Sequence, residues 1–472
     1  MILKNRLFRY IKIFILLILI CLIPNFVNGA EITKESEITL NGKKIDQKIV
    51  DNKENTFISI SKDTEINIKS ENNINGIYII YEYSSKEGII SANDKTEKIG
   101  ENGFLHEYIN VKDLIGITNE IKLKYNETVK IAEIYVLGQG EIPDFVEVWN
   151  KPCEKADLVL FSTHSDDEQL FFLGLLPTYV ARGAYVQVIY FANHNDAPSR
   201  LHEQLHGLYT VGIRNYPIMG LIPDSYSKSL EGAITNLKKA GITEEDAIKF
   251  QVEMIRRFKP QVVVGHDEKG EYSHGQHILN TFCLEKAIKY TNDANYDQES
   301  ADKYGIWEAK KVYLHLYPKN EITMDYDTPL EYFNGKTAYE VSKEGYKKHN
   351  SQQWTWFTGW INGKNTKYTK ATQIETYSPL KYGLYYTTVG VDTQKNDMFE
   401  NIIYYKDQEK KENKNENIVQ KNKEEYKQEN NKKNYTLYYI IVFSIILILL
   451  IRKINKQRKH KKRIKLKKKA IK

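Results

Sequence analysis

The pattern of apolar and polar positions along the chain changes near residue 150. From residue 156 to about residue 400, short apolar runs alternate with longer segments of helical period. The expected strands are 158–161, 184–192, 216–221, 261–265 and 311–317, and the expected helices are 169–182, 201–210, 244–259, 276–290 and 337–352. Strands that alternate with helices predict an α/β domain over residues 150–405, with a Rossmann-like, three-layer and mainly parallel sheet.

Residues 31–143 show a different pattern, without a segment of helical period of useful length. Short runs rich in Ile and Tyr, separated by Asn, Gly and Asp, occur at 57–61, 65–69, 76–83, 120–125 and 130–137. This spacing predicts an all-β sandwich. The region faintly resembles galactose-binding-like jelly rolls, so a sugar-binding role and a purely structural role both stay open.

Residues 1–30 have the pattern of a secretory signal peptide. A basic start is followed by the apolar run 13–23 and by the small residues Gly29 and Ala30. The alternative is an uncleaved anchor helix, for which the apolar run is short. We therefore expect cleavage near residue 30.

The other end of the chain predicts a membrane anchor. Residues 406–434 are nearly all Lys, Glu, Asn and Gln, which predicts a disordered stalk. Residues 435–451 are apolar apart from Thr436 and Ser444 and predict one transmembrane helix. The basic residues 452–472 then predict a cytoplasmic tail, with the catalytic domain outside the cell membrane.

The net charge of the chain is +7, but the basic excess belongs to the two ends. Residues 452–472 hold 13 Lys and Arg and residues 1–30 hold four, with no acidic residue in either segment. Residues 31–451 carry 51 basic and 61 acidic side chains, which indicates no nucleic-acid-binding domain. Three cysteines without a C-x-x-C pair exclude a disulfide scaffold, and whether Cys153 and Cys283 pair stays open.

The first candidate for chemistry is the stretch A-D-L-V-L-F-S-T-H-S-D-D-E at residues 156–168. Its apolar run reads as a buried strand, and open α/β sheets bind ligands at the carboxyl ends of their strands. His164 and Asp167 are typical zinc ligands, and Asp166 beside them is a candidate general base. The alternative is a polar turn that caps a helix, with Ser165 or Asp166 at the N-cap.

The second candidate is H-D-E-K-G-E-Y-S-H-G-Q-H at residues 266–277, directly after the expected strand 261–265. His274 and His277 are three residues apart where a loop turns into a helix, a spacing that brings both rings toward one face. His277 is a candidate third ligand to a zinc ion held by His164 and Asp167. Three protein ligands with an open position are typical of a catalytic zinc site.

Together these motifs resemble the PIG-L / LmbE-like de-N-acetylases over about residues 156–400. The family's usual H-P-D-D-E is T-H-S-D-D-E here, with Ser165 in place of the Pro, and its R-x-x-E element matches residues 200–203. The family's H-P-D-H is H-G-Q-H here, so Gln276 lacks the carboxylate that would orient His274. Residues 349–352 are similar to a late H-x-S-Q element of some members.

The resemblance implies a zinc-dependent deacetylase that acts on an N-acetylated amino sugar. It implies that the zinc ligands are His164, Asp167 and His277 and that Asp166 is the general base. His274 and Tyr272 are candidates for stabilising the oxyanion, and Arg200 and Asp224, near the same sheet edge, are candidates for holding sugar hydroxyls. An ion pair or helix cap is the alternative for the last two residues. Two other functions stay open: a sugar-binding surface protein with an inactive deacetylase domain, and a zinc amidase that acts on a non-sugar amide.

With the export signal and the anchor, we expect the substrate to be an N-acetylglucosamine-type unit in a surface glycan or glycolipid. The aromatic residues Trp354, Trp356, Phe357 and Trp360 are candidates for stacking on a sugar ring, with core packing as the alternative.

Overall fold

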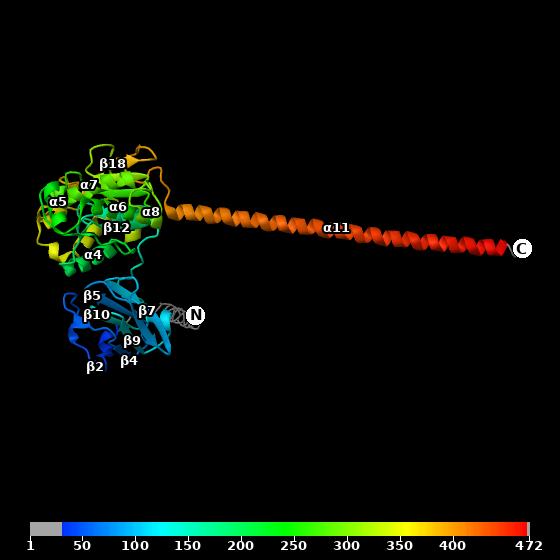
Figure 1. Cartoon of the computed structure of the whole chain (residues 1–472), viewed down its shortest axis with the longest axis horizontal. Helices are drawn as coiled ribbons and strands as arrows, with labels where there is room; N and C mark the ends of the chain where they lie inside the picture. The colour runs from blue at the N-terminus through cyan, green and yellow to red at the C-terminus, as the bar shows by residue number, and fades with distance from the viewer. Residues whose placement is uncertain (1–30, 470–472) are drawn as a thin grey trace, which may run out of the picture. The chain divides into compact units, whose positions relative to one another are not determined.

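The computed structural model describes residues 31–469, so the signal peptide predicted at 1–30 lies outside the described residues. The chain divides into two units, residues 1–404 and residues 405–472. In Figure 1 the described part of the first unit is coloured from blue through cyan and green to orange, and the second unit is the helix α11.

Two antiparallel sheets form the first part of unit 1, in the orders β2-β1-β4-β9-β6-β7 and β3-β10-β5-β8. The strands are β1 Ser36–Leu40, β2 Lys43–Lys44, β3 Ile58–Ile60, β4 Ile66–Ser70, β5 Gly76–Tyr81, β6 Gly88–Ala92, β7 Lys95–Ile99, β8 His106–Ile109, β9 Glu120–Tyr125 and β10 Val129–Leu137. Alternate side chains of both sheets, such as Ile66 and Ile68 of β4 and Ile77 and Ile79 of β5, pack in one apolar core. The period of two along each strand therefore buries one face of each sheet against the other.

A six-stranded sheet forms the rest of unit 1, in the order β12-β11-β15-β16-β18-β17. Strands β12, β11, β15 and β16 are parallel, and β18 and β17 join them in antiparallel pairs. The strands are β11 Leu158–Ser162, β12 Val186–Tyr190, β15 Val262–Gly265, β16 Lys311–His315, β17 Glu321–Thr323 and β18 Lys381–Thr387, with a separate parallel pair of β13 Ala192–Asn193 and β14 Ile222–Pro223.

Helices cover both faces of this sheet, and the pattern along β11 shows why. Leu158 and Leu160 pack in one core with side chains of α3, α4 and α9, whereas Val159 and Phe161 pack in another with side chains of α6 and α7. The helices are α2 Val111–Ile115, α3 Leu175–Ala181, α4 Pro198–Thr210, α5 Leu230–Lys239, α6 Glu244–Phe258, α7 Gly275–Tyr290, α8 Gln298–Tyr304, α9 Ala338–Tyr346 and α10 Trp356–Asn362. Because β11 is apolar toward both sides, this part of the chain has an α/β fold.

Several segments of unit 1 differ from the pattern-based expectation. The helix expected at 169–182 is only α3, because a series of turns precedes it and Gly174 adopts a φ of +84° at its start. The strand expected at 216–221 is reduced to an isolated bridge between Ile218 and Ile189, next to Pro217, which has no N–H to donate. Helix α5 was not expected from the pattern. Cys153 and Cys283 are free thiols.

Unit 2 is the helix α11, Tyr405–Lys469, where the composition predicted a disordered stalk at 406–434. The difference has a physical reason: Lys, Glu and Gln have high helix propensity, so a segment that cannot build a core can still form a helix. Within residues 31–469, one helical segment, Tyr438–Arg463, has the length and composition to cross a membrane. It overlaps the span predicted at 435–451.

Candidate active site

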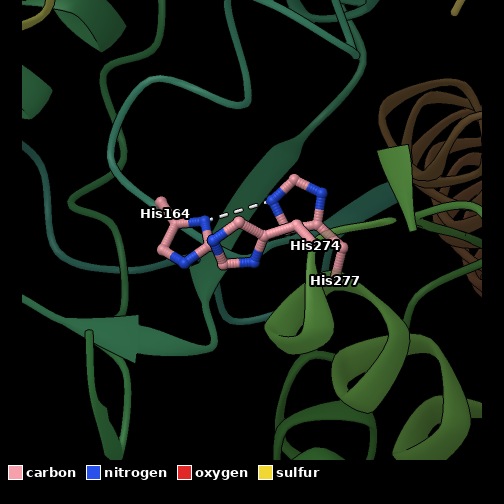
Figure 2. Close-up of side chains that lie close together, drawn as sticks. All are labelled: His164, His274 and His277. Atoms are coloured by element: carbon pink, nitrogen blue, oxygen red, sulfur yellow. Dashed lines mark hydrogen bonds between the residues drawn. The ribbon is translucent and has the colours of Figure 1, made fainter. Parts of the chain in front are cut away.

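The turns after β11 and β15 lie side by side because the two strands are parallel neighbours. His164 and Asp167 follow β11, while His274 and His277 follow β15 at the start of α7. Figure 2 shows the rings of His164, His274 and His277 close together, although His164 and His277 are 113 residues apart in the sequence. The topology of the sheet therefore brings the two sequence motifs into one site.

Three side-chain atoms of this site form a nearly equilateral triangle. His164 Nδ1 lies 3.1 Å from Asp167 Oδ2 and 3.1 Å from His277 Nε2, and the last two atoms are 3.2 Å apart. All three side chains are buried. Ligand atoms about 2.0–2.1 Å from a tetrahedral zinc ion lie about 3.3 Å from one another, and imidazole nitrogens with a carboxylate oxygen are ordinary zinc ligands. The donor set and its spacing fit zinc.

The remaining ring nitrogens of both histidines are held by neighbours. Glu271, a fully buried residue, lies 2.6 Å from Nδ1 of His277, and Gln276 Oε1 lies 2.9 Å from Nε2 of His164. Such contacts fix which ring nitrogen carries the proton and turn the other toward a metal. Both candidate histidine ligands are therefore oriented by the protein itself.

Glu271 also binds two further buried histidines. Its carboxylate oxygens lie 2.8 Å from Nδ1 of His266, which directly follows β15, and 2.6 Å from Nδ1 of His315, the last residue of β16. Burial alone would raise the pKa of Glu271, but His266, His277 and His315 more than offset it and hold the pKa well below its ordinary value. Glu271 is thus an ionised carboxylate that joins the carboxyl ends of β15 and β16 to the start of α7.

Asp166, the neighbour of a candidate ligand, is buried and has an unusual backbone. Its φ is +139°, a region that side chains other than glycine rarely adopt, and its N–H donates to Glu168 Oε2 at 3.0 Å. Arg200 Nη2 lies 3.5 Å from its Oδ1. Burial raises the pKa of Asp166, and the nearby charge of Arg200 opposes that shift while Asp167 adds to it. The carboxyl group therefore takes up a proton more readily than an exposed Asp.

His274 lies beside the triangle and caps helix α7. Its Nδ1 accepts the backbone N–H of Gln276 at 3.3 Å, which leaves Nε2 to carry the proton of the neutral ring. Burial, with the neighbouring His164 and His277, lowers the pKa of His274 to about 2. The side chain is therefore a neutral hydrogen-bond donor at physiological pH, and this orientation comes from the helix terminus without a carboxylate at position 276.

An aromatic row leads from the site to the surface. The ring of Tyr272 lies 5.6 Å from His277, 5.4 Å from His274 and 5.8 Å from Trp356, measured between ring centroids. Tyr226 lies 5.1 Å from His274, and it is 60% exposed, while Trp356 is 51% exposed. The candidate site thus has exposed aromatic rings at its rim.

Arg200 and Asp224 lie at the site and contact each other. Arg200 Nη1 donates to Asp224 Oδ2 at 2.9 Å, and its Nη2 donates to the carbonyl oxygen of Ser165 at 2.8 Å. Asp224 Oδ1 is also 3.5 Å from His164 Nε2. The guanidinium group therefore braces the turn that carries Asp166, as the ion-pair alternative predicts, and the side chain of Asp224 is 28% exposed.

A comparison with known families adds to this geometry. Residues 159–288 match the model of the PIG-L family, described as GlcNAc-PI de-N-acetylase. Residues 159–288 are a PIG-L domain. The match contains both histidine motifs and Arg200, whereas the α/β sheet continues beyond it to β18.

Two curated relatives match about a third of the chain. One is a 1D-myo-inositol 2-acetamido-2-deoxy-alpha-D-glucopyranoside deacetylase from Geodermatophilus obscurus, 27% identical over 186 residues, which are 34% of this chain and 62% of the relative. A deacetylase of the same name from Catenulispora acidiphila is 23% identical over 191 residues, 36% of this chain and 58% of the relative. The chain thus spans about 60% of the length of these relatives.

Among solved structures, the chain is similar to an N,N'-diacetylchitobiose deacetylase from Pyrococcus horikoshii. The identity is 15% and the TM-score 0.33, over 48% of this chain and 83% of that one. A similarity of this size carries no information about the site.

Several residues that support the PIG-L site were not singled out from the sequence. Glu271 stands inside the quoted second motif, where Gln276 was noted only for lacking a carboxylate, and the contacts of both depend on side-chain direction. His194, whose Nε2 accepts the N–H of Ser165 at 3.1 Å, belongs to no motif. The one signal that could have pointed to His194 is that a histidine closely follows a predicted strand, as His164 and His266 do.

Two elements named for their resemblance to the family meet behind the site. Glu203 of the R-x-x-E element accepts hydrogen bonds from the backbone N–H of Ser351 at 2.7 Å and from its hydroxyl at 2.6 Å. His349 Nε2 lies 3.1 Å from Glu168 Oε1, and both side chains are fully buried. The late H-x-S-Q segment therefore anchors on α4 and on the turn that carries Asp166.

Proposed function

We propose that this protein is a zinc-dependent deacetylase that hydrolyses the N-acetyl group of an amino sugar in a surface glycan or glycolipid. The observation that carries the proposal is the triangle of His164 Nδ1, Asp167 Oδ2 and His277 Nε2, with sides of 3.1–3.2 Å. The PIG-L domain and the names of the curated relatives, which are deacetylases of an acetamido sugar, support the reaction class.

The ion would be held by His164, Asp167 and His277. When bound, zinc supplies a positive charge that polarises the acetyl carbonyl group and lowers the pKa of water at the site. Glu271 and Gln276 keep the two imidazole rings in the tautomers that leave Nδ1 of His164 and Nε2 of His277 free. The rest of the reaction rests on groups of the chain.

Asp166 is the group that we propose as the general base and acid. Its carboxylate takes a proton from the attacking water and returns it to the sugar nitrogen, so that acetate and a free amine leave. Its raised pKa suits a group that must both accept and release a proton near neutral pH. Arg200 and Glu168 hold the strained turn in which it sits.

His274 is the group that we propose for the oxyanion. Its neutral ring presents Nε2–H, and a donor fixed in advance stabilises negative charge as it develops on the carbonyl oxygen. Tyr272 packs against this ring and against His277, and it is the second candidate donor.

The exposed aromatic rings bear on the size of the substrate. Tyr226 packs against His274, and Trp356 packs against Tyr272. Aromatic faces are the usual apolar surface for a sugar ring. We therefore propose a substrate of more than one sugar unit, with Asp224 at the mouth of the site as a partner for a hydroxyl group.

The location of the enzyme is also a proposal. The apolar residues 438–451 of the helical segment Tyr438–Arg463, with the basic residues 452–472 behind them, support a single span with a cytoplasmic C-terminus. The pattern of residues 1–30 supports export of the PIG-L domain. A domain outside the membrane would reach surface glycans and glycolipids.

The proposal is tested by acetate release from N-acetylated chitooligosaccharides. The purified full-length chain is stripped of metal with a chelator, assayed, and assayed again after zinc is returned. We expect activity to disappear and to return with zinc. A metal-stripped protein that deacetylates at the original rate would contradict the proposal.

A further inference from the structure

A second cluster of histidines and glutamates lies where the β-sandwich contacts the PIG-L domain. Glu54 precedes β3, His106 begins β8, Glu147 follows β10, and His202 and His206 belong to α4. His106, His202 and Glu147 are buried, while the side chains of His206 and Glu54 are 26% and 33% exposed. None of these residues takes part in the site described above.

Glu147 fixes the orientation of two of these rings. Its Oε2 lies 2.9 Å from Nδ1 of His106 and its Oε1 lies 2.6 Å from Nδ1 of His206, while the indole N–H of Trp149 donates to Oε2 at 3.0 Å. A carboxylate that holds the Nδ1–H of a histidine is the usual support of a histidine that binds a metal through Nε2. Here one carboxylate supports two histidines.

The groups beyond these rings converge. Nε2 of His206 lies 2.7 Å from Glu54 Oε1, and Nε2 of His106 lies 2.8 Å from Nδ1 of His202. One nitrogen of His106, one nitrogen of His206 and one carboxylate oxygen of Glu54 all lie within 4.8 Å of one another. The other nitrogen of His202, Nε2, is buried without a hydrogen-bond partner among residues 31–469.

We propose that Glu54, His106 and His206 bind a second divalent transition-metal ion, of the zinc class, at the contact between the β-sandwich and the PIG-L domain. Two imidazoles and one carboxylate suit zinc and its neighbours in the first transition row. The ligands come from the β-sandwich and from α4, so the ion stabilises the contact between the two. Helix α4 also carries Arg200 and Glu203, so the second ion steadies a helix that supports the first site.

The spacing along α4 is consistent with this double role. His202 and His206 are four residues apart and share one face of the helix, which contacts the β-sandwich through His106. Arg200 and Glu203 are three residues apart and contact Asp166, Asp224 and Ser351. One helix thus carries two polar faces with separate partners.

The test is the metal content of purified full-length protein in which the first site is disabled by His277→Ala. After dialysis against metal-free buffer, elemental analysis is expected to give two equivalents of metal per chain in the wild type and one in His277→Ala. Adding Glu54→Gln and His206→Gln to His277→Ala is expected to remove the remaining equivalent. Adding the exposed Glu97→Gln, on β7, to His277→Ala is the matched control and is expected to leave it.

A second measurement covers the case in which the added substitutions disturb folding. X-ray absorption of the ion left in His277→Ala is expected to show nitrogen and oxygen neighbours at about 2.0–2.2 Å, with the scattering of two imidazoles. A chelator is also expected to lower the melting temperature of His277→Ala. A His277→Ala protein that holds no ion after dialysis, or a remaining ion without imidazole neighbours, would overturn the proposal, and the cluster would then be a proton-shared network only.

Discussion

Nδ1 of His277 lies 2.6 Å from a carboxylate oxygen of Glu271, and both side chains are fully buried. The same carboxylate binds His266 and His315, so the charge that orients this candidate ligand is itself held by the ends of β15 and β16. The position of Nε2 of His277 therefore depends on the sheet as a whole and not only on its own helix.

This relationship predicts the effect of Glu271→Gln. The amide cannot accept from all three histidines as an ionised carboxylate does, so zinc binding should weaken about 10–100-fold. The dissociation constant is measured by competition with a chromophoric chelator. Glu268→Gln, an exposed change in the same turn, is the control and should bind zinc as the wild type does. Equal affinity in the two variants would remove Glu271 from the metal site.

Asp166→Asn should separate proton transfer from metal binding. The variant keeps the proposed ligands, so it should keep its zinc, while acetate release falls by about 10²–10⁴-fold through loss of the general base. Asp167→Asn is the matched change at the next residue and should lose the ion. If Asp166→Asn loses the ion and Asp167→Asn keeps it, the roles of the two residues are exchanged.

His274 should contribute a hydrogen bond and no ionisation. Its pKa of about 2 lies below the working range, so the ring stays neutral from about pH 5 to pH 9. His274→Ala should therefore lower kcat by about 10²–10³-fold without changing the shape of the pH–rate profile. A limb of the profile that disappears in His274→Ala would show that this histidine titrates during catalysis.

The roles of residues that follow predicted strands could be predicted from the sequence, whereas contacts that depend on side-chain direction could not. His164 and Asp167 follow one apolar run, and His277 lies in the motif that follows a second run. Because the two runs form the neighbouring parallel strands β11 and β15, pattern and topology together predicted that these residues meet. Glu271 and His194 act through side-chain directions in irregular turns, and no periodicity encodes those. Arg200 and Asp224 were expected to bind sugar, but their contact with each other across 24 residues depends on how α4 packs against the loop that follows β14.

Secondary-structure elements with local end signals were also predicted well, whereas segments shaped by long-range contacts were not. Strand β15 and helix α6 were predicted almost to their ends, because the Thr243 capping box and the left-handed Lys259 before Pro260 are local signals. The turns before α3 were not predicted, because tertiary contacts override the helical pattern there; one example is the hydrogen bond that the Gly174 N–H donates to the Ser342 hydroxyl at 2.8 Å. Helix α11 shows that a segment whose composition cannot form a hydrophobic core can be either helical or disordered.

The aromatic rim predicts a dependence on substrate length. Trp356→Ala should raise KM for a chitooligosaccharide by roughly threefold to tenfold, the effect of losing one stacking contact, and should leave KM for the single sugar unchanged. Tyr83→Ala, an exposed aromatic change on the β-sandwich, is the control. A variant with unchanged KM for both substrates would mean that Trp356 does not contact the glycan.

The anchor predicts the outcome of a truncation. A chain that ends at Asn434 lacks the candidate spanning segment Tyr438–Arg463 and should be released from cells with its deacetylase activity intact. The distribution of activity between the membrane fraction and the medium is the measurement. Truncated protein that stays with the membrane would indicate another anchor, such as an uncleaved N-terminal helix.

The central claim is that His164, Asp167 and His277 hold the zinc ion on which deacetylation depends. The most direct test measures zinc content and acetate release together in purified wild type and His277→Ala, with circular dichroism to establish that both are folded. The account predicts that the folded variant loses one equivalent of zinc per chain and all acetate release, and that added zinc restores neither. A His277→Ala protein with the metal content and activity of the wild type would contradict it.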